Sequence, residues 1–402
     1  MAKPEFLTFS SKELLPQEEV LEVQKGKSQL QIGIPREIYM QEKRVGLTPD
    51  AVQLLVAHGH DVVIETEAGM GASYTDSDYS EAGARIVYSA KDVYESDLII
   101  KIEPPSLKEI EMMKHRQCVI SAIQLKTRGK EYFRKLMEKK ITALSFENME
   151  DEDEMVPVVR SMSEIAGGTS ILIAAEYLSN ANNGKGFMLG GISGVPPTEV
   201  VIIGAGTVGA YAARTALGLG ASVKVFDKSL TKLRRLQNLL NNLPIYTCVI
   251  QPKILEKALM RCDVAIGAIR SPGGRTACVV TEDMVEKMKP GSVIVDVSID
   301  QGGCFETSEI TDHDEPVFRK FDVIHYCVPN IASRVSRTAS FSLSNILAPV
   351  LLSMGEAGGL DEFLACTSGV RAGLYIYKGT LVNKSIGEYF NIPYTDAHLL
   401  FG

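Results

Sequence analysis

The feature that most constrains the fold is a set of three closely spaced glycines, Gly204, Gly206 and Gly209, between an apolar segment and a helical one. Residues 200–203 have the composition of a buried strand, and residues 211–220 that of a helix. In such a unit the first glycine permits a tight turn, the second lets a pyrophosphate approach the backbone, and the third lets the helix pack on the strand. The motif therefore predicts a dinucleotide at the N-terminus of the helix, where the helix dipole stabilises negative charge.

An acidic residue, Asp227, ends the next strand-like segment. A carboxylate at this place accepts hydrogen bonds from the ribose 2′-hydroxyl and repels a 2′-phosphate, which favours NAD over NADP. Two alternatives remain open at this point. The glycines can form a turn that serves packing alone, and Asp227 can be an ordinary surface acid.

Short β-rich segments alternate with helical segments both before residue 150 and after residue 199, a pattern typical of parallel sheets covered by helices. We predict an α/β fold of two Rossmann-like domains with a cleft between them. The predicted parts are an N-terminal extension (1–28) that docks on the surface, a substrate or catalytic domain (29–158 plus 336–402) and an NAD-binding domain (159–335).

Composition narrows the choice of partners. The 402 residues are 45% hydrophobic and 23% charged, as in ordinary globular proteins, and the net charge of -8 is spread over interleaved acids and bases. Such a charge distribution provides no basic face of the kind that nucleic-acid binding requires. The seven scattered cysteines contain no CxxC pair, no group has metal-ligand spacing, and no apolar run or signal pattern indicates a membrane. We expect a cytoplasmic protein without a metal, acting on a small molecule.

Longer motifs resemble those of the alanine dehydrogenase and proton-translocating transhydrogenase α-subunit superfamily, and more closely its alanine dehydrogenase branch. They are IGIPRE with KRVGLTP, GHDVVIETEAGMGASYTDSDYSEAGARIV, MSEIAG, GGISGVPPTEVVIIGAGTVG, MKPGSVIVDVSIDQGGCFETS and HYCVPN, spread over about residues 30 to 390. The resemblance implies reversible NAD-dependent oxidative deamination of L-alanine to pyruvate and ammonia, usually by a hexamer.

The resemblance also implies roles for particular residues. Arg44 occupies the position of the arginine that binds the substrate carboxylate, which a guanidinium fork suits. Asp300 occupies the position of a catalytic aspartate near the nicotinamide; from its residue type alone, a helix N-cap or turn acid is the alternative. The further positions expected at the cofactor are Ser163, Val208, Lys232, Ile269, Arg270, Val297, Val328, Asn330 and Ile331.

Two catalytic positions depart from the family pattern. Glu103 stands where the family has a lysine that binds the substrate, and Gln124 stands where it has a proposed acid–base histidine. Glutamine does not exchange a proton near neutral pH. Arg270 also replaces an apolar residue beside the expected nicotinamide ribose, and Pro329 and Ser336 break the usual C-terminal pattern.

These departures leave two hypotheses open. In the first, the chain is an NAD-dependent amino-acid dehydrogenase with an altered substrate, in which Glu103 is the base. A displaced cation then comes from Lys101, expected on the same strand face as Glu103, or from Lys126 or Arg270. In the second, the chain is a catalytically silent NAD(H)-binding relative with a sensing or scaffold role.

Overall fold

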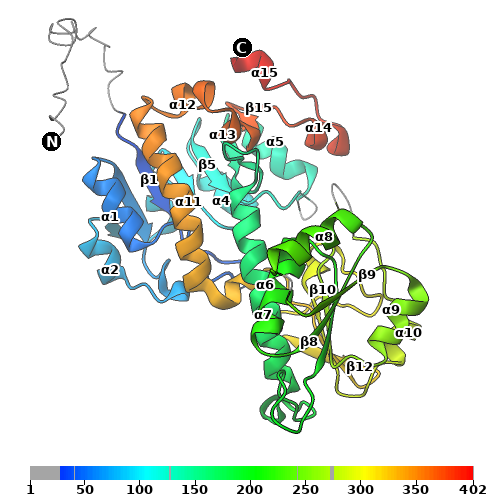
Figure 1. The fold of residues 1–402 in the computed structure, drawn as a ribbon. Coiled ribbons are helices and arrows are strands. Elements are labelled where there is room, and N and C mark those ends of the chain that lie inside the picture. Colours follow the sequence, from blue (N-terminus) through cyan, green and yellow to red (C-terminus); the bar gives the residue numbers. More distant parts are fainter. Residues whose placement is uncertain (1–27, 40, 126–127, 242, 272–275, 402) are drawn as a thin grey trace, which may run out of the picture.

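The computed structural model describes residues 28–39, 41–125, 128–241, 243–271 and 276–401, which form two α/β domains (Figure 1). The domains lie side by side and are joined by the long helix α6 (Pro157–Leu178) and by the chain that leads into α11 (Ser336–Glu356). The predicted α/β class with two Rossmann-like domains is confirmed. Apart from Ser28, the expected N-terminal extension lies outside the described residues.

The first domain contains an eight-stranded sheet of order β15-β14-β6-β5-β4-β1-β2-β3. Six strands are parallel: β1 (Gln31–Ile34), β2 (Asp61–Glu65), β3 (Arg85–Val87), β4 (Leu98–Ile100), β5 (Cys118–Ser121) and β6 (Thr142–Ser145). At one edge, β14 (Leu374–Tyr377) pairs antiparallel with β6 and with β15 (Thr380–Leu381). The C-terminal part of the chain thus completes the first sheet.

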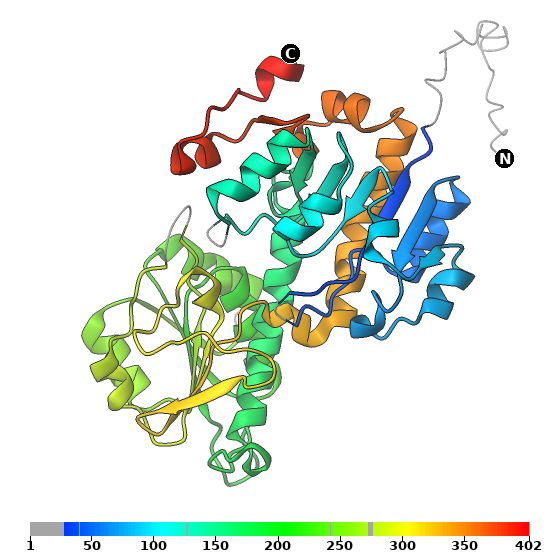
Figure 2. The ribbon, with the colours of Figure 1, turned by 180° about the vertical axis from the view of Figure 1, so that it is seen from behind.

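Helices cover both faces of this sheet. One apolar cluster joins the sheet to α11, α1 (Pro49–Ala57) and α12 (Leu360–Cys366). A second cluster, on the opposite face, holds side chains of α3 (Ala90–Val93), α4 (Leu107–Met112), α5 (Lys130–Glu138) and α14 (Lys384–Phe390). The view from behind shows the helices on this face (Figure 2). The remaining helices of this domain are α2 (Asp76–Glu81), α13 (Ser368–Ala372) and α15 (His398–Phe401).

The second domain contains a seven-stranded sheet of order β12-β13-β11-β10-β7-β8-β9. Its strands are β7 (Glu199–Ile203), β8 (Ser222–Asp227), β9 (Ile245–Val249), β10 (Val264–Gly267), β11 (Val293–Asp296), β12 (Val317–Lys320) and β13 (Val323–Tyr326), and only β12 is antiparallel to its neighbour. Helices α6, α7 (Thr207–Gly218) and α8 (Leu230–Leu239) pack on one face, and α9 (Pro252–Leu259) and α10 (Glu282–Glu286) on the other.

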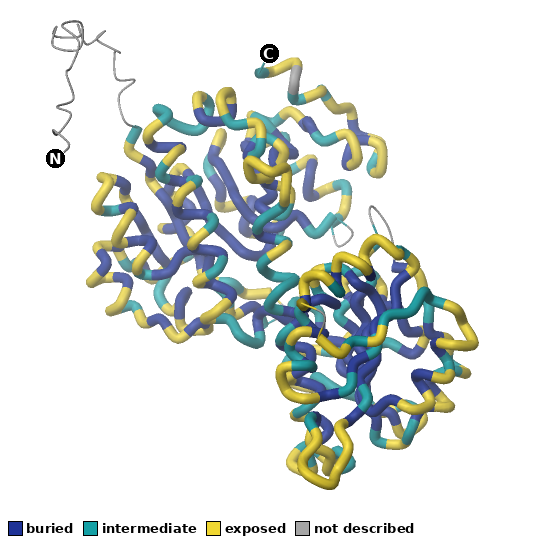
Figure 3. The backbone as a smooth tube through the Cα atoms, in the orientation of Figure 1, coloured by how far each residue is buried: buried dark blue, intermediate teal, exposed yellow. Residues whose placement is uncertain are grey.

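Burial follows the layers: the central strands of both sheets are buried, whereas edge strands such as β9 and β12 are half-buried and many loops are exposed (Figure 3). One stretch among the described residues, Ile331–Glu356, is long and apolar enough by composition to cross a membrane. Serine, threonine and arginine interrupt the apolar residues of this stretch, so it contains no continuous apolar run of membrane-spanning length. Leu343, Leu347 and Leu351 are buried against the first sheet, so the packing of a core helix accounts for its apolar side.

Candidate active site and cofactor site

The glycine loop between β7 and α7 has the geometry that the sequence predicts. Gly204 has a φ of +117°, a backbone conformation that residues other than glycine rarely adopt. A Cβ at this position would also clash with the carbonyl oxygen of Ala268. Gly206 caps α7, and a side chain there would project into open space. A Cβ on Gly209 would collide with the carbonyl of Gly204, so its absence lets the helix pack on the turn. The loop leaves its backbone open to a pyrophosphate.

Asp227 ends β8 beside this loop and is 6% exposed. Its Oδ2 accepts a hydrogen bond from the backbone N–H of Ala205 and its Oδ1 one from that of Ser229, both at 2.8 Å. These two bonds orient the carboxylate toward the glycine loop and leave further lone pairs for ribose hydroxyls. Two hydrogen bonds thus fix the Asp227 carboxylate beside the glycine loop. The backbone N–H groups of the loop and the carboxylate of Asp227 are the donors and the acceptor that fit NAD.

The other expected cofactor residues gather near the carboxyl ends of the second sheet's strands, where open α/β sheets bind ligands. Ser163 on α6 and Val208 on α7 are half-buried, and Lys232 on α8 is exposed. After β10, the backbone N–H of Ile269 donates to Ser298 Oγ at 2.9 Å. The rest comprise exposed Arg270, half-buried Val297 and Asn330, and buried Val328 and Ile331.

Asp300 lies in a 3₁₀ turn (Val297–Gln301) after β11. Asp300 does not cap this turn, which was the alternative role for it. The N-cap is Asp296, whose buried side chain accepts a hydrogen bond from the backbone N–H of Ser298 at 3.0 Å. The side chain of Asp300 is accessible to solvent. The protein around this exposed carboxyl group still removes part of its hydration, and this desolvation raises the pKa of Asp300 to about 6. The charge of Arg44 opposes the rise. Asp300 therefore interacts electrostatically with Arg44 of the other domain.

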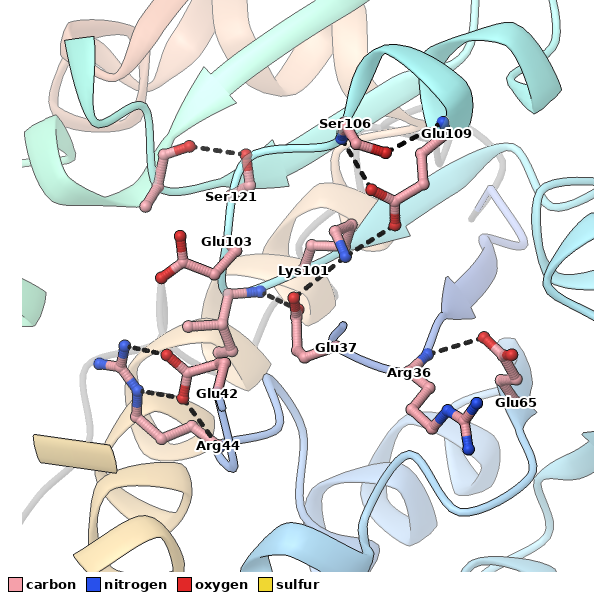
Figure 4. Close-up of polar contacts among 12 residues, drawn as sticks. Arg36, Glu37, Glu42, Arg44, Glu65, Lys101, Glu103, Ser106, Glu109 and Ser121 are labelled. Atoms are coloured by element: carbon pink, nitrogen blue, oxygen red, sulfur yellow. Dashed lines mark hydrogen bonds and ion pairs between the residues drawn. The ribbon is translucent and has the colours of Figure 1, made fainter. Parts of the chain in front are cut away.

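Arg44 is paired with Glu42 of its own loop (Figure 4). Its Nε and Nη2 donate to the two carboxylate oxygens of Glu42 at 2.8 and 2.6 Å, and the Glu42 side chain is 0% exposed. The Nη1 of Arg44 lies 3.5 Å from Met162 Sδ. Asn330 Nδ2 also donates to Glu42 at 3.3 Å, which ties the pair to the second domain. One edge of the guanidinium fork is thus already occupied by a carboxylate.

The two substituted positions contact each other. Gln124 Nε2 donates to Glu103 Oε2 at 2.6 Å, and Glu103 is 4% exposed. Burial, reinforced by the nearby charge of Glu42, raises the pKa of Glu103 to about 7 even though Arg44 lowers it. Glu103 thus holds its proton close to neutral pH.

Lys101 does not lie where the sequence analysis expected it. Strand β4 ends at Ile100, so strand alternation does not extend to residue 103, and Lys101 and Glu103 point apart (Figure 4). Lys101 Nζ is 3.0 Å from carboxylate oxygens of both Glu37 and Glu109, and its side chain is 1% exposed. Lys101 therefore stabilises the interior of the first domain, and its predicted substrate-binding role is wrong.

Arg128 was not among the predicted site residues. It lies just before α5 with Nη2 3.5 Å from Gln124 Oε1, and its guanidinium carbon is 5.9 Å from the ring centroids of both Tyr39 and Tyr132. Arg128 belongs to none of the family motifs; its only signal in the sequence is its place four residues after Gln124. Glu147 was also missed; its Oε2 accepts from the backbone N–H of Ile123 at 2.8 Å.

Comparison with known proteins extends over both domains. The profile described as "Alanine dehydrogenase/PNT, N-terminal domain" matches residues 33–166, and its C-terminal counterpart matches residues 170–384. The chain belongs to the alanine dehydrogenase/PNT family. Alanine dehydrogenase 2 of Staphylococcus aureus (strain USA300) is 39% identical over 366 residues, covering 91% of this chain and 98% of the relative.

Solved structures in the alanine dehydrogenase/PNT family agree. An L-alanine dehydrogenase superimposes with a TM-score of 0.84 at 38% identity, covering 90% of this chain and 99% of the other. A transhydrogenase from Sinorhizobium meliloti gives 0.75 at 26% identity, covering 88% and 99%. The sequence resemblance is thus confirmed, and the chain is an alanine dehydrogenase-like member of its family.

Proposed function

We propose that this protein is an NAD-dependent amino-acid dehydrogenase in which Glu103 transfers the protons of the reaction. The observation that carries the proposal is the state of Glu103: it is buried beside Gln124, close to the charge of Arg44, and has a pKa of about 7. A group that titrates near neutral pH is populated in both forms, as a general acid–base requires.

The reaction we propose converts an amino acid and water to the 2-oxo acid and ammonia, and the reverse. Bound NAD supplies the hydride acceptor, held at Gly204, Gly206 and Gly209 with Asp227 at the ribose. Ionised Glu103 takes one proton of the water that adds to the iminium carbon, and protonated Glu103 gives it to the departing amine. The second proton of that water passes to solvent as the hydroxyl becomes the carbonyl of the 2-oxo acid. Asp300 lies on the cofactor side of the same interdomain site and orients the substrate's amine.

L-alanine and pyruvate are the first substrates to test, because the relatives with the highest identity reported above are named alanine dehydrogenases. The acid at position 103 changes the preference, since a carboxylate attracts an ammonium group and repels a substrate carboxylate. We therefore propose that a substrate with an additional amine is turned over better than alanine. A cytoplasmic location and a homo-hexamer are also part of this proposal.

One observation favours the second candidate, a silent NAD(H)-binding relative. Arg44 is engaged by Glu42, and Lys101 is sealed between Glu37 and Glu109. A site whose cations are already paired binds NAD(H) without holding a substrate anion. The similarity to a transhydrogenase is compatible with such a role.

The deciding experiment measures NADH oxidation by the purified protein with ammonia and a panel of 2-oxo acids, with NADH binding followed by fluorescence. Turnover that falls at least 100-fold in the E103Q variant, with NADH affinity unchanged, supports the enzyme. An E131Q variant, altered at an exposed glutamate of α5, is the matched control and keeps full activity. Tight NADH binding without turnover of any substrate refutes the enzyme and favours the silent binder.

A further inference from the structure

We propose that Glu37 is the positioning residue for Glu103. Its carboxylate holds the backbone of Ile102 and so directs the next side chain, that of Glu103, toward Gln124. This role deepens the proposed function and rests on it, because Glu103 is the proton-transfer group proposed above. Glu37 acts through the backbone and does not touch the substrate.

The chain that carries Glu103 begins where the first sheet loses one of its strands. Strand β1 pairs with β4 as far as Gly33 and Ile99, and it ends one residue later. On the other side the chain after β5 still contributes, since the N–H of Ala122 donates to the carbonyl oxygen of Ile102 at 3.0 Å. The N–H of Ile102 takes its acceptor from a side chain, Oε1 of Glu37, at 2.6 Å. A buried backbone N–H needs such a partner, so Glu37 continues the hydrogen bonding of the sheet beyond the end of β1.

Glu37 is itself fixed by Lys101. Its Oε2 accepts from Lys101 Nζ at 3.0 Å, and the side chains of Lys101 and Glu37 are 1% and 6% exposed. Hydrogen bonds that involve charged groups are stronger than neutral ones. One carboxylate thus binds the side chain of Lys101 and the backbone of Ile102, the two residues directly before Glu103.

The direction of Glu103 follows from this hold. Glu37 and Lys101 lie on one side of the segment, and the carboxyl group of Glu103 lies on the other (Figure 4). There Glu103 accepts from Gln124 Nε2 at 2.6 Å and is 4% exposed. Without the bond from Ile102 to Glu37, the segment is free to turn and Glu103 is free to move into water.

The pKa of Glu103 reports where its carboxyl group lies. Burial is the main cause that raises this pKa to about 7; the charges of Glu42 and Glu37 add to the rise, while Arg44 and the hydrogen bond from Gln124 oppose it. A Glu103 that moves into water regains its hydration, and its pKa falls toward 4.5. Because the charge of Glu37 contributes by itself, a test must separate this charge from the bond to Ile102.

Three substitutions separate the two effects. E37A removes both the charge and the acceptor for Ile102. E37Q removes the charge alone, because the amide oxygen still accepts from Ile102. E109Q is the matched control: Glu109 is also a buried partner of Lys101, at 3.0 Å, and its amide replacement still accepts from the N–H of Ser106. If E37A does not fold, E37D takes its place, because the shorter acid keeps the charge but does not reach both of its partners.

The first readout does not depend on turnover. E103Q is added to wild type and to each variant, and the resulting rise in Tm is measured at pH 5 and pH 8. We expect the extra rise at pH 8 to be as large in E109Q as in wild type, to keep more than half of its size in E37Q, and to be lost in E37A. Equal rises in E37A and E37Q would overturn the role of Glu37, because its bond to Ile102 would then have no effect on Glu103.

The second readout is the pH profile of deamination with the best amino acid of the panel. We expect kcat in E37A to fall about 10- to 100-fold with little change in KM or in NADH affinity, as for a catalytic group displaced by about 1 Å. The acid limb of the profile should also move to lower pH in E37A, because Glu103 then ionises more readily. E37Q should lose less activity than E37A, and E109Q should keep the wild-type limb. An E37A profile that is lower but has the limb of wild type would show a structural effect only and would overturn the role.

The role of Glu37 and the enzyme proposal fail separately. If wild type turns over no substrate but the Tm readout separates E37A from E37Q as expected, the enzyme proposal fails and the role of Glu37 in placing Glu103 stands. If wild type is active and E37A behaves like E37Q in both readouts, the role of Glu37 fails and the enzyme proposal stands. If wild type is inactive and E103Q gives no extra rise at pH 8, both are refuted.

Discussion

Replacing Glu103 by glutamine should stabilise the protein, and the gain should grow with pH. Glu103 is 4% exposed, and burial raises its pKa from 4.5 to about 7. An acid whose pKa is higher in the folded state contributes full stability below the unfolded pKa. It loses that stability as the pH rises from 4.5 through 7, because the unfolded chain releases the proton first.

The size of the effect follows from the two pKa values. Their difference of about 2.5, at 1.36 kcal/mol for each pH unit, corresponds to about 3 kcal/mol above pH 7. At pH 5 the same relation gives about 1 kcal/mol, because this pH lies only just above the pKa of Glu103 in the unfolded chain and well below its pKa in the folded protein. Glutamine has no such titration, and its side-chain oxygen still accepts from Gln124. The E103Q variant should therefore exceed wild type by about 1 kcal/mol at pH 5 and about 3 kcal/mol at pH 8.

Thermal unfolding followed by circular dichroism at the two pH values measures this difference. For a domain of this size, 3 kcal/mol corresponds to a rise in Tm on the order of 6–12 °C. E131Q, at an exposed site, should show no pH-dependent gain. An E103Q gain that is the same at pH 5 and pH 8, or a loss at pH 8, would refute the reasoning about the burial of Glu103.

Three further variants test the pairs and the glycine loop. R44Q leaves Glu42 buried without its partner and should lower the free energy of unfolding by about 3–5 kcal/mol in urea titrations. Adding Glu42→Gln should recover most of this loss, and the absence of recovery would contradict the pairing. D227N should raise NADPH affinity relative to NADH about 10-fold in fluorescence titrations, because it removes the charge that repels a 2′-phosphate, and an unchanged ratio would show that Asp227 does not face the ribose. G204A strains a φ of +117° and clashes with Ala268, so NADH affinity should fall more than 10-fold; wild-type affinity would remove the loop from the site.

The sequence predicts the two sheets and the glycine loop because these depend on local periodicity. Alternating apolar segments specify the buried parallel strands, and glycines at fixed spacing specify one turn. The sequence pattern is weaker for β9, β12, β14 and β15. β9, β12 and β15 are edge strands without a continuous buried pattern, and β14 pairs with β6, a strand more than 200 residues earlier. Local composition carries no signal for such distant pairing.

The charges of the site are harder to predict than its location. The resemblance identified Arg44, Glu103 and Gln124, but not which partner each one has. Glu42 is two residues from Arg44, a spacing that puts both side chains on one face of an extended segment but does not show that they pair with each other. The true partner of Lys101 depends on where β4 ends, and boundaries are the least predictable part of an element. Arg128 comes near Gln124 only because the chain turns before α5.

Positions 103 and 124 should act as a unit when the family's residues are restored. Histidine at 124 in Q124H lies beside the carboxylate of Glu103, which raises the histidine pKa and keeps the ring protonated and unable to accept a proton. Lysine at 103 in E103K faces a glutamine, which does not exchange protons. In the double variant the lysine charge lowers the histidine pKa and leaves a neutral base beside a cation.

Alanine-dependent NADH formation should therefore appear in the double variant and exceed by at least 10-fold the sum of the rates of the two single variants. Measuring all four proteins at pH 8 with equal NAD occupancy makes the comparison one of chemistry, not cofactor binding. A single variant as active as the double would show that the two side chains act independently. Their 2.6 Å contact would then be incidental to catalysis.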